Sequence, residues 1–198
     1  TIINIISSNN QYGLTKDINI LISQLKTSFK DLSINFVNYF DFQCKYADIN
    51  IFVETVSNIL FKYANINILI PNQEWFNKTW IPYLENFDYI LTKTNYASDI
   101  FRNLTKSKIK YIGWESKDMY EKKYKKDYSK ILHVCGKSIY KQTQHLINEW
   151  EEDMPHLTII YDSKMIDITK SNIKNITYIE NRISENELIK YMNSIGIH

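Results

Sequence analysis

The stretch Ile66-Asn-Ile-Leu-Ile-Pro71 is a short run of aliphatic residues that ends at a proline. Such a run is typical of a strand buried on both faces of a parallel sheet. Similar runs recur at Ile2–Ile6, Ile34–Tyr39, Ile49–Val53, Tyr89–Thr92, Ile109–Ile112, Ile131–Cys135, Leu157–Tyr161 and Ile176–Ile179. Segments with helical periodicity separate several of these runs, and this alternation predicts βαβ units of the α/β class.

Helices are predicted where apolar residues recur at helical spacing. The predicted stripes are Ile18, Ile22, Leu25 and Phe29; Val56, Ile59, Leu60 and Tyr63; Ala97, Ile100, Phe101 and Leu104; Ile139, Thr143, Leu146, Ile147 and Trp150; and the segment Glu185–Asn193.

The segment Met119–Ser129 is polar and charged, and it separates two halves that repeat the same alternation. We therefore predict an N-terminal Rossmann-like lobe at residues 1–118, a linker at 119–129 and a C-terminal Rossmann-like lobe at 130–198. The second lobe contains three predicted strands, and another strand is expected to start at Gly196. We expect the second lobe to be incomplete and the chain to be a fragment of a longer protein.

The composition allows a sizeable core, because 44% of the 198 residues are hydrophobic and 23% are charged. The net charge of +2 lacks the basic excess of a general nucleic-acid binder, so nucleic acid is not an expected partner.

No run reaches the roughly 18 apolar residues of a membrane span, so we expect a soluble, cytoplasmic protein without an integral membrane segment. Cys44 and Cys135 are predicted to be buried, reduced thiols.

Glycine is scarce, with four residues in the chain, and this scarcity excludes two nucleotide-binding motifs. No two glycines lie close enough for the dinucleotide fingerprint, and Ile131 stands where a P-loop ending in Gly136-Lys-Ser138 needs its first glycine. Gly13, Gly113 and Gly136 follow predicted strands. Ligands of open parallel sheets bind beyond the carboxyl ends of the strands, so these glycines either make turns or mark a ligand cleft.

Two further groups of side chains lie at predicted strand ends. Lys137 and Lys141 are one helical turn apart, and they form either a diphosphate cradle or a solvated basic turn. Glu74 is either a sugar ligand or acid/base group, or it starts a helix beside the core aromatics Trp75 and Phe76. The four histidines have no paired spacing and no Asp-x-Asp occurs, so no metal site is predicted.

Several motifs, taken in order, resemble GT-B-fold glycosyltransferases of the family 4 (group 1) type. Their first lobe is represented by the cleft loop Asn9–Lys16 and by Ile70–Phe76, Asp88–Thr94 and Tyr111–Ser116. Leu132–Ser138 with Lys141 is similar to the start of their donor-binding lobe, and Tyr178–Leu188 to the stretch before their nucleotide-contacting segment. The resemblance implies two Rossmann-like lobes of the GT-B type, the second one incomplete.

The resemblance also implies an enzyme that transfers a sugar from a nucleotide-sugar donor to a glycan, lipid or protein acceptor. Transfer would occur with retention, without an essential metal and without a separate cofactor. The donor diphosphate would be bound by Gly136, Lys137, Ser138 and Lys141, and Glu74 is the catalytic candidate. The cleft loops would contain Tyr12, Gly13, Leu14, Asn72, Gly113 and Ser116.

The chain departs from the family's pattern at several positions. Lys137 stands where the family usually has arginine, Gln142 stands where it has glycine, and Glu74 is the nearest candidate where many relatives carry histidine. The family's paired glutamates would lie beyond residue 198, so we expect these 198 residues alone to be inactive. A non-catalytic sugar- or partner-binding protein on the same scaffold is the alternative function. A Rossmann-like epimerase is disfavoured, because neither a dinucleotide glycine loop nor paired catalytic acids are found.

Overall fold

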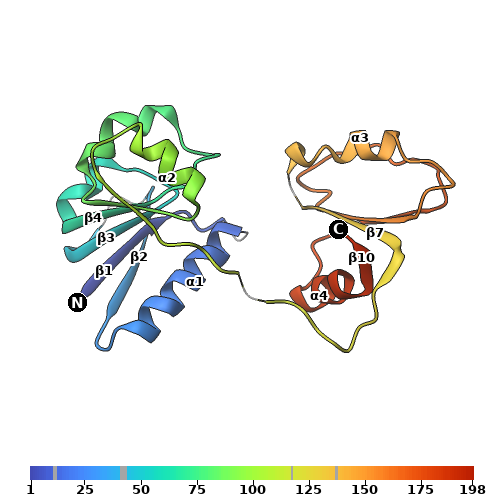
Figure 1. The fold of residues 1–198 in the computed structure, drawn as a ribbon, viewed down its shortest axis with the longest axis horizontal. Helices are drawn as coiled ribbons and strands as arrows, with labels where there is room; N and C mark the ends of the chain where they lie inside the picture. Colours follow the sequence, from blue (N-terminus) through green and yellow to red (C-terminus); the bar gives the residue numbers. More distant parts are fainter. Residues whose placement is uncertain (11–12, 41–43, 117, 137) are drawn as a thin grey trace. The chain divides into compact units, whose positions relative to one another are not determined.

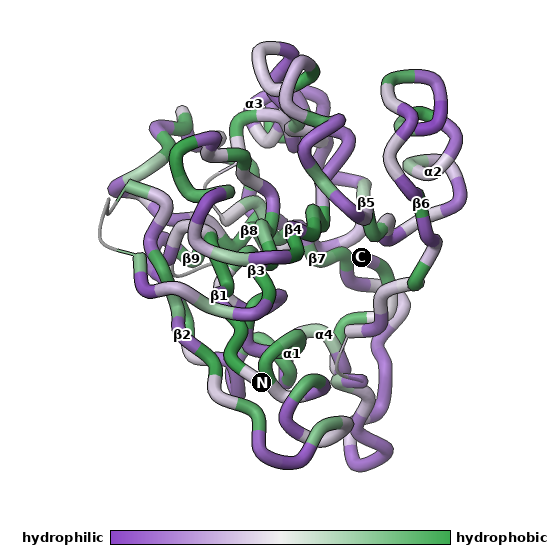
Figure 2. Tube along the Cα trace, turned by 90° about the vertical axis from the view of Figure 1, so that its left-hand side faces the viewer, coloured by the Kyte–Doolittle hydropathy of each residue, from purple (hydrophilic) through white to green (hydrophobic). Residues whose placement is uncertain are grey.

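Each apolar run that predicted a strand forms one in the computed structural model, which describes residues 1–10, 13–40, 44–116, 118–136 and 138–198 (Figure 1). The chain divides into two units, Thr1–Ser116 and Lys117–His198, here called unit 1 and unit 2. In Figure 2 the strands are drawn mainly in hydrophobic green and most loops in purple. Each unit contains one parallel sheet with helices, so the chain belongs to the α/β class.

Unit 1 is built on a six-stranded parallel sheet in the order β2-β1-β3-β4-β5-β6. The strands are β1 (Ile2–Ser7), β2 (Ser33–Asn38), β3 (Ala47–Val53), β4 (Ala64–Ile70), β5 (Tyr89–Thr92) and β6 (Lys108–Tyr111). The chain passes from β1 to β2 and then returns to β3 on the other side of β1. The strand order therefore reverses between β1 and β3, and ligands of open α/β sheets bind at such a switch point.

The helices cover the two faces of this sheet unequally. α1 (Gly13–Ser28) packs Ile18, Leu21 and Leu25 against one face. The 3-10 helices η1 (Asn58–Tyr63) and η2 (Lys78–Asn86) and the helix α2 (Asn95–Arg102) pack against the other. Within the described residues α1 is therefore the one helix on its face, where Trp114 from the segment after β6 also packs.

A row of asparagines crosses the sheet of unit 1. Asn35, Asn4, Asn50 and Asn67 stand in register on β2, β1, β3 and β4. Asn35 Nδ2 donates to Asn4 Oδ1 at 3.1 Å, and Asn4 Nδ2 donates to Asn50 Oδ1 at 3.0 Å. Asn50 Nδ2 in turn donates to Asn67 Oδ1 at 3.0 Å. Because buried amides need partners, this asparagine ladder favours one register of the strands.

Unit 2 contains a four-stranded parallel sheet in the order β10-β7-β8-β9. Its strands are β7 (Asp127–Gly136), β8 (His156–Tyr161), β9 (Ile176–Ile179) and β10 (Ile195–Ile197), the last at the place where another strand was expected to start. α3 (Thr143–Asn148) packs on one face through Ile147, and α4 (Glu185–Ser194) packs on the other through Leu188. The strand order reverses between β7 and β10, which makes a second switch point.

The predicted helix through Val56–Tyr63 is wrong in type and extent. η1 begins at Asn58, and Ile59 is exposed. The side-chain amide of Asn50 donates to the carbonyl of Leu60 at 2.9 Å, and that of Asn67 donates to the carbonyl of Phe61 at 3.2 Å. These bonds from the asparagine ladder occupy carbonyls that a continuing helix would use.

The predicted helix from Ile139 to Trp150 is also divided. The chain first forms the short 3-10 helix η3 (Ile139–Lys141), and Gln142 then adopts a left-handed conformation with a φ of 52°. α3 begins only after this residue. Ile139 is 70% exposed and does not belong to the buried stripe.

Part of the predicted linker at 119–129 is bound to unit 2. β7 begins inside it, at Asp127. The buried Asn193 of α4 accepts a hydrogen bond from the backbone N–H of Glu121 at 2.8 Å, and its Nδ2 donates to the carbonyl of Met119 at 2.7 Å. This part of the segment is therefore anchored to α4. In the described part of the chain, no helix has the length and apolar character needed to span a bilayer.

Candidate functional site

The carboxyl ends of the six parallel strands form one edge of unit 1, and the predicted site residues of this unit follow those ends. Gly13 and Leu14 open α1, Asn72 and Glu74 follow β4, and Gly113 and Ser116 follow β6. Tyr12 lies outside the described residues. The fold thus brings the described predicted positions to one edge of one sheet.

Glu74 lies in an exposed turn after β4. Its backbone N–H donates to Asn72 Oδ1 at 3.2 Å, and the neighbouring Trp75 is 61% exposed. Phe76 is packed edge-to-face against Phe101, with the ring centres 5.1 Å apart. Glu74 does not start a helix, since η2 begins at Lys78. Because the side chain of Glu74 is exposed, it is accessible to a ligand.

Lys93 directly follows β5, and its ammonium group lies between two carboxylates. Nζ donates to Asp17 Oδ2 at 2.6 Å and to Glu54 Oε1 at 2.8 Å. It also lies 4.7 Å from the ring centre of Trp114, whose indole nitrogen donates to Asp17 Oδ1 at 3.3 Å. These four residues, here called the Lys93 cluster, come from α1 and from the loops after β3, β5 and β6.

The charged groups of the Lys93 cluster are largely withdrawn from solvent. The side chains of Lys93, Asp17 and Glu54 are 16%, 27% and 18% exposed. Burial lowers the pKa of Lys93, but the hydrogen bonds to Asp17 and Glu54 outweigh this effect and raise that pKa above its ordinary value of 10.5. With one cation and two carboxylates, the cluster offers acceptors to hydroxyl groups and repels a phosphate.

The backbone at Glu54 is strained. Its φ of 55° lies in the left-handed region, which costs a residue other than glycine roughly 1 kcal/mol. The N–H of Glu54 donates to the carbonyl of Ile70 at 2.9 Å and so holds this conformation. The next residue, Thr55, is buried, and its Oγ1 has no hydrogen-bond partner among the described residues. Strain and an unsatisfied hydroxyl at a switch point are typical of a functional site.

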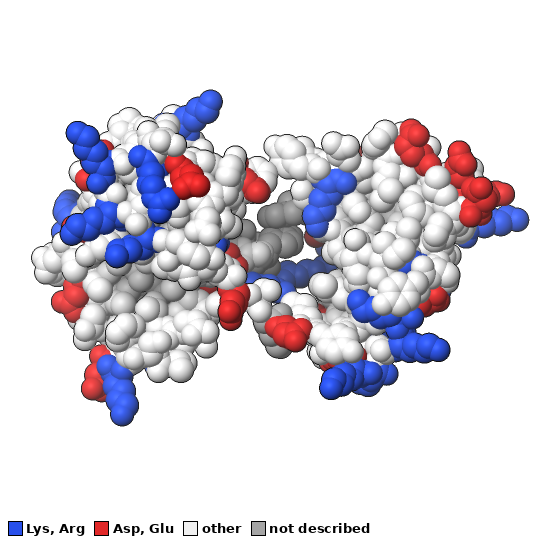
Figure 3. Space-filling view, in the orientation of Figure 1, with Lys and Arg blue, Asp and Glu red and all other residues white. Residues whose placement is uncertain are grey.

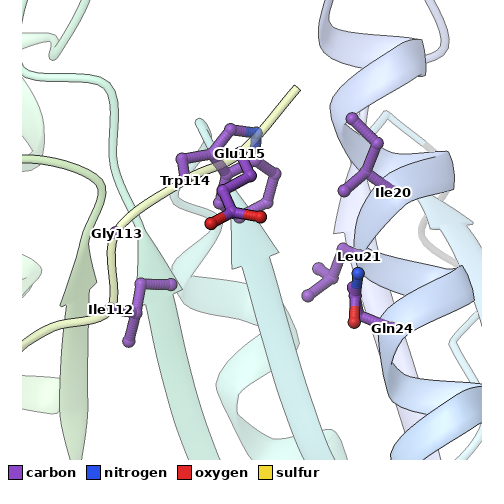
Figure 4. A pocket seen from close by; sticks show the side chains of 7 residues that line it. All are labelled: Ile20, Leu21, Gln24, Ile112, Gly113, Trp114 and Glu115. Atoms are coloured by element: carbon purple, nitrogen blue, oxygen red, sulfur yellow. The ribbon is translucent and has the colours of Figure 1, made fainter. Parts of the chain in front are cut away.

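A pocket of about 390 Å³ lies beside the Lys93 cluster, between α1 and the segment after β6 (Figure 4). It is lined by Ile20, Leu21, Gln24, Ile112, Gly113, Trp114 and Glu115. Figure 4 shows the side chains of α1 facing Trp114 and Glu115 across the opening. An aromatic ring, a carboxylate and an amide around an otherwise apolar pocket suit a ring that carries hydroxyl groups, such as a sugar.

The described members of the predicted diphosphate site lie at the switch point of unit 2. Gly136 ends β7 with a φ of 61°, and Ser138 precedes η3. The amine of Lys141 donates to the carbonyl of Val134, which places its positive charge at the carboxyl end of the same strand. Lys137 lies outside the described residues. Gly136, Ser138 and Lys141 are therefore close together, but α3 begins later than the predicted cradle requires.

His133 lies on β7 close to this strand end. Its Nε2 is 2.9 Å from Thr143 Oγ1, at the start of α3. Burial, and then the charge of Lys141, lower the pKa of His133 below its ordinary value of 6.5. The imidazole is therefore neutral at pH 7 and joins β7 to α3 through a hydrogen bond.

No group of three or more His, Cys, Asp or Glu residues that could hold a metal ion occurs among the described residues. On the face shown in Figure 3, basic and acidic side chains are interspersed over unit 1, and acidic side chains gather at one end of unit 2.

Sequence reasoning missed Asp17, Glu54 and Lys93. The signal for two of them was present, because Glu54 directly follows the run Ile49–Val53 and Lys93 directly follows Tyr89–Thr92. A charged residue immediately after a buried parallel strand lies at the edge where ligands bind. Asp17 carries no such signal, since its partner is 76 positions away.

No protein-family model matches the chain, and no curated protein matches it. The fold alone defines its class, an α/β protein with two parallel sheets of the Rossmann-like kind. The two units differ in the charge at the carboxyl ends of their strands. In unit 1 this edge carries the carboxylates of Asp17 and Glu54 beside Trp114, and in unit 2 it carries the amine of Lys141.

Proposed function

We propose that the chain is a glycosyltransferase sequence of the GT-B type, with unit 1 on the acceptor side and unit 2 on the donor side. The reaction is transfer of a sugar from a nucleotide-sugar to an acceptor, with retention and without a metal. The observation that carries this proposal is the strand order of unit 2, which puts Gly136 and Lys141 at the carboxyl end of a central strand beside a switch point.

The donor diphosphate is assigned to the end of β7. Gly136 has no side chain there, and the space where its Cβ would stand is open. Lys141 and Lys137 neutralise the charge that develops on the leaving diphosphate, and the hydroxyl of Ser138 donates a hydrogen bond to it. A lysine gives a point charge without the planar fork of arginine, so the diphosphate is held by charge more than by fixed geometry.

The acceptor is assigned to the pocket beside Trp114. The Lys93 cluster next to it carries an excess of carboxylate oxygens, which accept hydrogen bonds from sugar hydroxyls but repel phosphate. This contrast between the two strand ends supports the division of roles between the units. Glu74, exposed after β4, is the candidate acid/base or hydroxyl-binding group.

Calorimetry with the whole chain tests the donor site. A panel of nucleoside diphosphates and nucleotide-sugars is titrated with and without EDTA, and we expect one nucleotide class to bind equally in both. Lys141→Ala should weaken binding at least about tenfold, as expected for a lost charge-assisted contact. Lys174→Ala is the matched control, because this exposed lysine precedes β9 and lies at the opposite edge of the sheet. If no nucleotide binds, or if both variants behave alike, the donor assignment is wrong.

The alternative, a non-catalytic sugar-binding protein, is favoured by one observation. Among the described residues, those that line the pocket beside Trp114 all belong to unit 1. In this case free glycans bind while nucleotide-sugars do not. Glu115→Gln and Gln24→Ala should then weaken glycan binding in a glycan-array or calorimetric assay, and Lys141→Ala should leave it unchanged.

A further inference from the structure

A second cavity lies in unit 1, on the sheet face that carries α1. Its volume is about 420 Å³, and its wall is formed mainly by aliphatic side chains. Ile49, Ile51, Ile68 and Leu91 line it from the sheet, and Leu21 and Leu25 line it from α1. Parallel sheets are normally covered by helices on both faces. In the described part of unit 1, α1 is the one helix on this face, so the cavity lies beside it where a second helix would pack.

The cavity runs obliquely across the sheet, because its lining moves two residues along the strand direction for each strand that it crosses from β3 to β6. Ile49 pairs with Ile66 of β4, Ile68 pairs with Tyr89 of β5, and Leu91 pairs with Lys110 of β6. Ile112, the lining residue furthest along, therefore lies six residue steps beyond Ile49 in register. At about 3.3 Å per residue, the lining extends over about 20 Å. We call this cavity the acyl slot.

One end of the acyl slot carries a positive charge. Lys30, just after α1, lines the slot and is exposed, and no ion pair to it is found among the described residues. The neighbouring Phe29 is 57% exposed and also lines the slot. An elongated aliphatic space with a cation at one end is complementary to an alkyl chain that ends in an anionic group.

We infer that unit 1 binds one anionic acyl chain, with the alkyl part in the acyl slot and the carboxylate at Lys30. Each methylene that enters the slot leaves water for an aliphatic environment, which is the main source of affinity. The carboxylate stays at the exposed end, where it pairs with the ammonium group without being desolvated. Leu21 and Ile112 line both the acyl slot and the pocket beside Trp114, but the inference uses no residue of the donor site. The proposed function is tested by nucleotide binding and Lys141→Ala, so its failure is distinguishable from a failure of fatty-acid binding.

Displacement of a fluorescent dansyl-labelled undecanoic acid from the whole chain, supported by native mass spectrometry, tests this inference. Octanoate, dodecanoate, hexadecanoate and eicosanoate are compared below their micelle concentrations. Affinity should rise roughly tenfold for each two methylenes until the slot is full, and then level off. One fatty acid should bind per chain. An affinity that keeps rising with length, or binding of many copies, would indicate surface adsorption and overturn the inference.

Two variants address the two parts of the site. Leu25→Trp fills the slot and should abolish hexadecanoate binding. Lys30→Glu should weaken hexadecanoate about tenfold and leave the uncharged hexadecanol unchanged. Lys26→Glu is the matched control, since this exposed lysine of α1 does not line the slot. Far-UV circular dichroism verifies that each variant is folded. If Leu25→Trp is misfolded, the comparison of Lys30→Glu with Lys26→Glu decides.

Two other occupants are outcomes of the same experiments. If the chain does not bind monomeric hexadecanoate but sediments with phosphatidylglycerol vesicles, the face is a membrane contact. If light scattering shows a dimer that Leu25→Trp dissociates, the slot is covered by a second copy. Either result overturns the assignment to a single acyl chain.

Discussion

The side-chain amide of Asn50 donates to Oδ1 of Asn67 at 3.0 Å, and the two residues are paired in register on β3 and β4. Both are buried in a sheet whose remaining side chains are mostly aliphatic. The bond belongs to the asparagine ladder that also includes Asn4 and Asn35. Moving one strand by a single residue would place each amide on the opposite face from its partner.

Replacing Asn50 by valine should therefore lower the free energy of unfolding by about 3 kcal/mol, because Asn67 Oδ1 and the carbonyl of Leu60 each lose a buried donor. Urea unfolding followed by circular dichroism measures the loss. Asn65→Val is the control on the neighbouring strand β4, since Asn65 is exposed and its Oδ1 accepts a hydrogen bond from the exposed Tyr46 hydroxyl at 2.6 Å. Equal effects of the two substitutions would show that the ladder contributes nothing.

Lys93→Met should destabilise unit 1 by about 2 kcal/mol, because it leaves the carboxylates of Asp17 and Glu54 partly buried without their cation. Arg102→Met removes the cation of an exposed pair with Asp99 and should change stability by no more than about 0.5 kcal/mol. Thermal unfolding compares the two. If Lys93→Met lowers the melting temperature no more than Arg102→Met does, the Lys93 cluster does not stabilise unit 1.

The pH dependence of stability should contain a contribution from His133. Its pKa is lowered in the folded state by burial and by Lys141, so the unfolded chain takes up a proton first as the pH falls. The contribution of His133 to the free energy of unfolding is complete above the ordinary pKa of 6.5. It is lost as the pH falls from 6.5 through the lower pKa of the folded state. Urea unfolding between pH 8 and pH 5 should show a decline that is smaller in His133→Gln. His156→Gln should keep the decline of the unsubstituted chain.

Two glycines should respond oppositely to alanine. A Cβ at Gly196 would lie 2.6 Å from Cδ1 and 2.7 Å from the backbone Cα of Tyr128, so the pairing of β10 with β7 must open. We expect Gly196→Ala to cost about 2 kcal/mol. At Gly13 a Cβ meets nothing, and Gly13→Ala should be neutral or stabilise α1 by up to about 1 kcal/mol. Melting temperatures of the two variants check the prediction; a loss at Gly13 and none at Gly196 would contradict it.

The strands could be predicted from the sequence because isoleucine-rich runs such as Ile66–Ile70 have few structural alternatives. The helices were less predictable. At Val56–Tyr63 the periodicity was helical, but bonds from Asn50 and Asn67, which lie on β3 and β4, decide the local conformation. The left-handed Gln142 has no counterpart in the periodicity at all. The first of these errors arises where tertiary contacts override local preference.

The candidate site was predictable only in part. The end of a predicted strand marks where a loop begins, so Glu74, Gly113 and Gly136 could be placed at the carboxyl ends of their strands. The Lys93 cluster could not be assembled, because its members are brought together by strand order, which periodicity does not determine. The acyl slot depends on the uneven distribution of helices over two faces, and this too follows from topology.

The Lys93 cluster has a mechanical consequence. The ammonium group of Lys93, in the loop after β5, donates hydrogen bonds to Asp17 of α1 and to Glu54 in the loop after β3. It also lies over the ring of Trp114, in the segment after β6. Moving any one of these four segments away therefore breaks a hydrogen bond or the contact with the Trp114 ring. A ligand that displaced Lys93 from both carboxylates would therefore release the loop after β5 from α1 and from the loop after β3 at the same time.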